Sequence, residues 1–229
     1  MDFLKGLVKQ QNYDISSDND DERQVGLNRG GAVQVNSREA LVDQWARAGR
    51  VFIYHNPIIG TPETMSANGT TVTLTAPSVR FTVPAGTIVV PIDFQARVAT
   101  VIAKSDIFTV IATGSDSYTS GGEALTPLNA YIDAGTSLTP SAVTNIHNSD
   151  TAIVEAALVS PRLLKSQKRQ GQAAELATTW NPEYNILKGD KMVYMKGPAS
   201  FLVFVVQETT AAEAEFSGSY AVLRVGEVG

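Results

Sequence analysis

From Arg50 onward, apolar and polar residues alternate with a period of two, which is typical of half-buried β-strands. The alternation is clearest at Val79, Phe81 and Val83, and a continuous apolar run follows at 201–206. Residues that favour turns, mainly Gly, Pro, Asn and Asp, separate these runs. The pattern predicts roughly eight to ten short strands, as in a β-sandwich or a barrel.

The strands are expected at 51–53, 72–74, 79–83, 88–92, 96–103, 107–112, 130–134, 184–186, 192–195, 200–206 and 220–225. Residues 104–106 read as a turn that pairs 96–103 with 107–112 in a hairpin. The core is expected to include eight apolar residues of these strands: Val79, Phe81, Val101, Phe108, Val110, Phe201, Val203 and Leu223.

The loops between the strands are less uniform. Residues 114–127 are expected to form a loop, in which Gly121 and Gly122 suit a turn with positive φ. Residues 151–164 fit a pair of strands or a strand followed by a loop. Residues 167–178 fit a loop or a short helix, and both interpretations remain open.

One segment has the spacing of a helix. Ser37 is a good N-cap because its hydroxyl can accept a hydrogen bond from a free backbone N–H, and Gly49 is a natural end. The apolar residues between them share one face: Leu41, Val42, Trp45 and Ala48. The sequence therefore predicts a short helix at 37–49.

Residues 1–36 are interpreted as an extended N-terminal arm. The arm has a short apolar patch and an acidic run at 18–22, which together bury too little apolar surface to fold alone. The patch is the candidate assembly contact, and its residues are Phe3, Leu4, Leu7 and Val8. Residues 37–229 are interpreted as one β-sandwich domain that begins with the helix.

Charge and composition narrow the class of protein. Charged residues make up 18% of the chain, and the net charge of −5 argues against nucleic-acid binding, which needs clustered Lys and Arg. The one basic cluster, Lys165, Lys168 and Arg169, is interpreted as a solvated loop. The chain has no Cys, which excludes disulfides and thiol chemistry. No apolar stretch is long enough to predict a membrane span.

Catalytic equipment is not evident. His55 and His147 are far apart in sequence, so a metal site is not expected, and no cofactor is predicted. The chain has neither a Gly-x-Ser-x-Gly elbow nor a phosphate-binding Gly-rich loop. Four acids on or beside strands cannot be distinguished from ordinary strand-end acids: Asp93, Glu123, Asp133 and Glu155. We predict that the protein is not an enzyme.

Two short motifs suggest a family. Residues 117–122 form a Tyr-x-Ser-Gly-Gly loop that precedes a Pro-x-Asn step at 127–129, and Glu183-Tyr184-x-Ile186 leads through a turn to an apolar strand. Together, residues 77–228 resemble structural proteins of phage virions. This resemblance implies a jelly-roll-like antiparallel β-sandwich of capsid, vertex or capsid-decoration type, without enzymatic activity.

The resemblance also implies partners and a location. A protein of this kind is expected to bind copies of itself and other virion proteins, and to assemble in the host cytoplasm into the virion. One alternative is a receptor- or carbohydrate-binding β-sandwich of a phage tail or spike, which a groove lined by exposed Trp or Tyr would favour. The other is a cupin-like enzyme, which a metal bound at His55 or His147 would favour.

Overall fold

The structure is a computed structural model, and it describes residues 26–27, 33–34, 38–65, 69–98, 105–131, 143–146, 152–170, 179–208 and 212–224. The chain divides into two units, residues 1–37 and 38–229. In the first unit, β1 (Gly26–Leu27) pairs with β2 (Val33–Gln34) in an antiparallel ladder. The expected assembly patch, Phe3, Leu4, Leu7 and Val8, lies outside the described residues.

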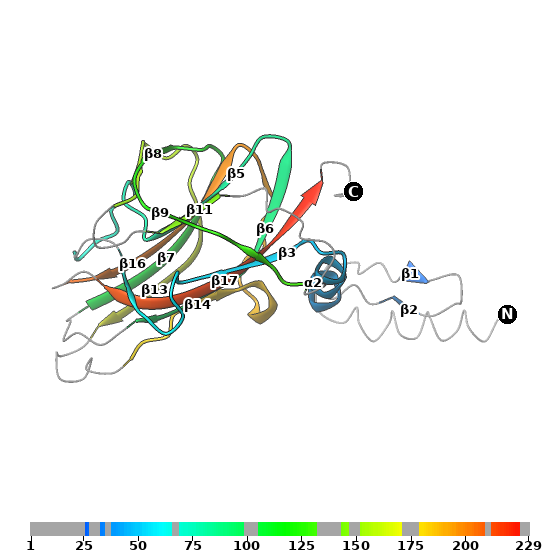
Figure 1. The fold of residues 1–229 in the computed structure, drawn as a ribbon, viewed down its shortest axis with the longest axis horizontal. Coiled ribbons are helices and arrows are strands. Elements are labelled where there is room, and N and C mark those ends of the chain that lie inside the picture. Colours follow the sequence, from blue (N-terminus) through cyan, green and yellow to red (C-terminus); the bar gives the residue numbers. More distant parts are fainter. Residues whose placement is uncertain are drawn as a thin grey trace, which may run out of the picture. The chain divides into compact units, whose positions relative to one another are not determined.

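Most of the regular secondary structure of the second unit is β-strand (Figure 1). Its helices are α2 (Arg38–Arg47) and the 3-10 helix η1 (Ile186–Lys188). Its strands are β3 (Val51–His55), β4 (Glu63–Thr64), β5 (Val79–Val83), β6 (Thr87–Val98), β7 (Ser105–Thr113), β8 (Tyr118–Ser120), β9 (Glu123–Leu125), β10 (Leu128–Asn129), β11 (Val143–Ile146), β12 (Val154–Glu155), β13 (Arg162–Gln170), β14 (Glu183–Asn185), β15 (Met195–Lys196), β16 (Ala199–Gln207) and β17 (Glu213–Arg224).

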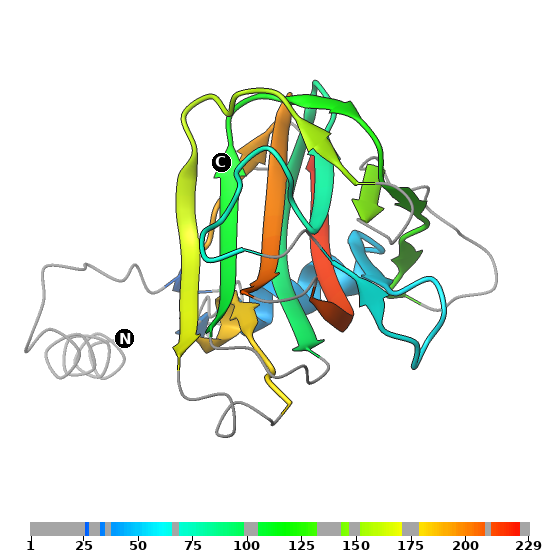
Figure 2. The ribbon, with the colours of Figure 1, turned by 90° about the vertical axis from the view of Figure 1, so that its left-hand side faces the viewer.

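Eight of these strands form the framework of a sandwich. One sheet contains β3-β17-β6-β14 as neighbours and the other contains β13-β7-β16-β5, with every pair antiparallel; β7, β13 and β16 run side by side in Figure 2. Along the chain, the first framework strand pairs with the eighth, the second with the seventh, the third with the sixth and the fourth with the fifth. This is the pairing of a long hairpin rolled into two layers, which is a jelly roll. The predicted jelly-roll-like β-sandwich is therefore confirmed.

Aromatic side chains from both sheets fill the space between the layers. Phe81 stacks on Phe201 within its own sheet, with ring centroids 4.7 Å apart, and on Tyr220 of the opposite sheet at 5.2 Å. Phe94 and Phe108 make a second stacked pair across the layers at 6.0 Å. Seven of the eight predicted core residues are buried, and Val101 lies outside the described residues. The period of two identified these inward-facing positions correctly.

The outward face of the β13-β7-β16-β5 sheet carries a second, smaller cluster. Its residues are Ile107, Ile111, Leu202, Phe204 and Val206, with Val72 and Leu158 packed against them. The loop 69–78 and the segment 152–160 supply this cover, and the backbone N–H of Glu155 donates to the carbonyl of Thr75 at 2.9 Å. The strand expected at 72–74 is thus wrong, because Val72 contributes to a loop that packs on a sheet.

The predicted hairpin of 96–103 with 107–112 is also wrong. The two strands of that region, β6 and β7, belong to opposite sheets, and each pairs with strands distant in sequence. Ser105 and Asp106, read as a turn, begin β7 and are buried. Alternation of polar and apolar residues gives the inward face of a strand but does not identify its partner.

The single predicted helix is confirmed as α2. Trp45 is buried, and Leu41 and Val42 pack against the main core. The helix ends at Gly49, whose φ is 67°, with Gly49 N–H bonded to the carbonyl of Ala46 and Arg50 N–H bonded to that of Trp45. These two bonds form a Schellman C-cap, for which Gly is favoured because the left-handed conformation is strained for other residues. Ser37, the expected N-cap, lies outside the described residues.

Candidate functional site

The outward face of the sheet that contains β3 is organised in rows across the strands. Directly opposed residues in an antiparallel ladder project to the same face. One row runs Leu128, Ile53, Ser219, Asp93 and Asn185. A second row runs His55, Ser217, Gln95 and Glu183. The face is thus apolar at the β10–β3 side and polar over β17, β6 and β14.

Four aliphatic residues at the apolar side are exposed, and we call them the β3 surface. The exposed fractions are 42% for Ile53, 63% for Ile58, 82% for Ile59 and 57% for Leu128. Ile53 and Leu128 face each other across the ladder, and Ile58 and Ile59 follow β3 directly. Single exposed aliphatic residues are common on protein surfaces, whereas a contiguous apolar patch is typical of an interaction site.

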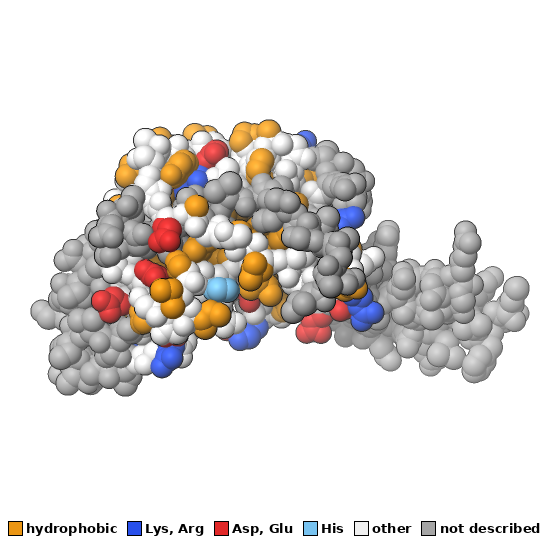
Figure 3. All heavy atoms as spheres, viewed as in Figure 1, with side chains coloured by type: hydrophobic (Ala, Val, Ile, Leu, Met, Phe, Trp, Pro, Cys, Tyr) orange, Lys and Arg blue, Asp and Glu red, His pale blue; other side chains and the backbone are white. Residues whose placement is uncertain are grey.

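A cavity of about 440 Å³ adjoins the β3 surface and is lined partly by Ile59 and His55. Its lining also includes charged residues: Arg97, which lies 3.7 Å from Glu215, and Glu183, which lies 2.7 Å from Lys188. Among the described residues that line it there is no Trp or Tyr. The face visible in Figure 3 shows hydrophobic side chains close together with charged side chains sparse between them.

Asp93 lies in the first row between Ser219 and Asn185 and is partly buried. The hydroxyl of Ser219 donates a short hydrogen bond to its carboxylate. Burial raises the pKa of Asp93 above its usual value, and the hydrogen bonds from Ser219 oppose that rise. The carboxylate of Asp93 is therefore held by Ser219 of the neighbouring strand.

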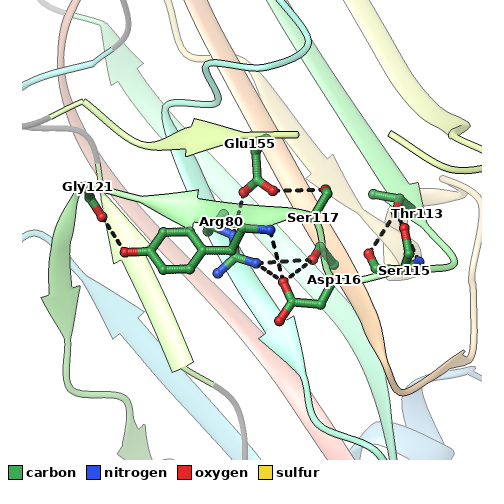
Figure 4. A network of polar contacts seen from close by, with 9 residues as sticks. Arg80, Thr113, Ser115, Asp116, Ser117, Gly121 and Glu155 are labelled. Carbon is green, nitrogen blue, oxygen red and sulfur yellow. Dashed lines mark hydrogen bonds and ion pairs between the residues drawn. The ribbon is translucent and has the colours of Figure 1, made fainter. Parts of the chain in front are cut away.

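A buried ion-pair network lies on the other sheet, and we call it the polar anchor (Figure 4). Arg80 projects from β5, and its side chain is 2% exposed. Its Nε lies 2.5 Å from Glu155 Oε1, and its Nη2 donates to the carboxylate of Asp116 and to Ser200 Oγ at 3.2 Å. Ser117 Oγ also donates to Glu155 at 2.9 Å. Burial raises the pKa of Glu155, while the charge of Arg80 and the Ser117 hydrogen bond oppose that rise.

The polar anchor fixes the ribbon of β8 and β12 to β5. The guanidinium carbon of Arg80 lies 4.4 Å from the centroid of the Tyr118 ring, and Tyr118 Oη donates to the carbonyl of Gly121 at 2.8 Å. Gly121 and Gly122 have φ of 87° and 74°, which confirms the predicted turn with positive φ. The Tyr-x-Ser-Gly-Gly motif therefore has a structural task, which is to cover the charge of Arg80.

Gly121 also allows a close backbone approach. A Cβ at this position would lie 1.7 Å from the carbonyl oxygen of Ala152, on the segment that leads into β12. The motif thus brings two stretches of chain together as well as supplying the turn.

Replacing Gly121 by Ala should lower stability by more than the about 1–2 kcal/mol that a positive φ costs, because the overlap with Ala152 adds to that strain. Thermal unfolding of the variant measures the loss. Gly86→Ala is the matched control, since its φ is 80° and nothing lies within 4 Å of the new Cβ. Equal losses for the two variants would show that the close approach has no energetic weight.

Among the remaining residues named from the sequence, the described residues His55, Asp93 and Glu155 lie in three different local environments. His55 lines the cavity with Nδ1 2.6 Å from the carbonyl oxygen of Asn56, while His147 and Asp133 lie outside the described residues. Glu155 belongs to the polar anchor and Asp93 to the opposite sheet. Within the described ranges, no group of three or more His, Cys, Asp or Glu is placed to hold a metal ion.

The basic cluster is part of a strand. Lys165, Lys168 and Arg169 belong to β13, at the edge of its sheet, so the loop interpretation is wrong. Lys165 Nζ pairs with Asp190 at 2.6 Å, and Arg169 Nε donates to the buried carboxylate of Asp106 at 2.8 Å. Charged residues on an edge strand oppose unwanted pairing with other sheets, which explains a run that looks like a loop in sequence.

No protein-family model matches the chain, and a search of curated proteins finds no significant match. Among the helices of the described residues, none has the length and hydropathy needed to cross a membrane.

Proposed function

We propose that this protein is a structural subunit of a virus particle and works through contacts between copies of itself. The observation that carries the proposal is the β3 surface, where Ile53 of β3, Leu128 of the paired strand β10, and Ile58 and Ile59 of the loop after β3 are all exposed. Centres of stable interfaces are depleted of charge and enriched in apolar contact. A second copy would shield these side chains from water.

The fold is compatible with this function but does not select it. Jelly rolls serve as capsid proteins, lectins and cupins, so the site must decide between them. The exposed side chains of the β3 surface are aliphatic, which suits contact with another protein. The cavity beside it has no Trp or Tyr among its described lining residues, and this was the feature that would have favoured carbohydrate binding.

The proposal is tested by replacing Ile58 and Ile59 together with Ser. We expect self-association to weaken by at least about tenfold, because truncation of a central interface residue typically costs more than 1 kcal/mol. Sedimentation velocity over a range of concentrations measures the change.

Val159→Ser is the matched control for this experiment, because Val159 is 56% exposed on another part of the molecule. A second control replaces His55 and His147 with Gln, and assembly should survive it. Equal weakening by the Val159 variant would contradict the proposal. If the His variant lost both its assembly and a metal ion that the wild-type protein binds, the cupin-like enzyme would be favoured.

The arm supplies a further prediction. Deleting residues 1–36 should leave a soluble β domain, because the described residues of the core all belong to the second unit. The deleted protein should associate poorly, since the apolar patch at Phe3, Leu4, Leu7 and Val8 is removed with the arm. Circular dichroism and sedimentation report the two properties separately. If the deleted protein assembled as strongly as the full chain, the arm would have no role in assembly.

A further inference from the structure

A second cavity, of about 210 Å³, lies at the end of the sandwich where β7 ends and β13 begins. Both sheets contribute to it: Arg162 comes from β13, and Lys196 comes from β15 of the opposite sheet. Its described lining comes from three stretches of chain, 112–114, 160–162 and 193–199.

The lining of this cavity is basic, although the whole chain has a net charge of −5. Arg162 and Lys196 line it, and the described residues of its lining include no Asp or Glu. Within the described residues, neither of these two cations has a carboxylate within ion-pair distance, whereas Lys165 and Arg169 on the same strand β13 are each paired with an Asp. Both residues are exposed at this cavity, so a single anion that entered from solvent could meet both positive charges without displacing an existing ion pair.

Neutral donors surround the two cations. Ser160 and Tyr194, which both have hydroxyl groups, also line the cavity, and Tyr194 is 48% exposed. Ser160 has a φ of 49°, in the left-handed region that a non-Gly residue rarely adopts, and such strain is concentrated at ligand-binding positions. The base of the cavity is firm, because Met195, Ala199 and Ala112 are buried.

We propose that this cavity binds a small oxyanion of the phosphate class. A guanidinium offers two parallel N–H donors, an ammonium adds a compact charge, and hydroxyl groups complete the shell of a tetrahedral anion. The cavity is small and open, which suits a single phosphoryl group. The site lies outside the β3 surface and its residues take no part in the proposed assembly contact.

The test is equilibrium dialysis of the full chain against radiolabelled inorganic phosphate, at constant ionic strength set with chloride. We expect saturable binding of one phosphate per chain. Arg162→Gln and Lys196→Gln should each weaken that binding by at least about tenfold, because each removes a charge-assisted contact. Acetate, a planar monovalent anion, should compete poorly with phosphate, whereas methyl phosphate should compete as well as phosphate if one ester oxygen can face solvent.

Lys168→Gln is the matched control, since it removes an equal charge from the same strand outside the cavity. Its phosphate binding should equal that of the wild-type chain. The proposal is overturned if phosphate does not bind saturably, if acetate competes as well as phosphate, or if the Lys168 variant loses as much affinity as the Arg162 and Lys196 variants. The last two results would show general attraction of anions to a basic surface. Circular dichroism of each variant confirms that it is folded, so a loss of binding is not a loss of structure.

Discussion

Replacing Phe201 by Ala should lower the free energy of unfolding by about 3–5 kcal/mol, one of the two largest effects expected in this protein. Phe201 is 1% exposed, and its ring contacts those of Phe81 and Tyr184, so it joins β16 to β5 and to the opposite sheet. The cavity left by truncation cannot close easily between two layers of strands. Urea-induced unfolding followed by circular dichroism measures the loss.

Leu128→Ala is the control for that experiment, because Leu128 is 57% exposed and little apolar surface is buried there. Its effect on unfolding should stay within about 0.5 kcal/mol. A loss below about 1 kcal/mol for the Phe201 variant would contradict the aromatic core described above.

The second large effect is expected at the polar anchor. Arg80→Met should destabilise the fold by about 3–5 kcal/mol, because it leaves the carboxylate of Glu155 buried without its cation. The same variant should loosen the ribbon of β8 and β12, since Arg80 also contacts Asp116 and Tyr118. Hydrogen exchange of the β8 amides measures the local effect, and thermal unfolding measures the global one.

A double variant separates the loss of the Arg80–Glu155 ion pair from the cost of leaving the Glu155 carboxylate buried without a cation. Arg80→Met combined with Glu155→Leu should recover a large part of the lost stability, because both buried charges are then absent. If the double variant were less stable than Arg80→Met alone, the destabilisation would come from packing, and the electrostatic account of the anchor would be wrong.

The inward-facing residues were predictable because apolar and polar residues alternate along a half-buried strand. Val79, Phe81 and Val83 alternate with polar or exposed neighbours, and the buried face follows from that spacing alone. In β3 the signal is ambiguous, since Val51, Phe52, Ile53 and Tyr54 are all apolar. The structure places Phe52 and Tyr54 in the core and leaves Ile53 exposed. The sequence does not show which residues of β3 face outward, so the β3 surface could not be predicted.

Strand partners and buried charges were not predictable for a different reason. In a jelly roll the first framework strand pairs with the last, so the partner of β3 is β17, more than 150 positions away. A charged residue gives the same signal in a turn and in a buried pair: Asp106 was read as a turn residue, but its partner Arg169 lies on the neighbouring strand. Arg80 was missed in the same way, because Asp116 and Glu155 approach it only in the folded chain.

We propose that the protein works as a self-assembling subunit, and the mass of the purified native protein shows whether copies of it associate. Sedimentation velocity or native mass measurement at micromolar concentration should show a closed species of many copies, since stable interfaces bury on the order of 1,200–2,000 Å² and persist at such concentrations. A protein that stays at the mass of a single chain over the whole concentration range would contradict the account.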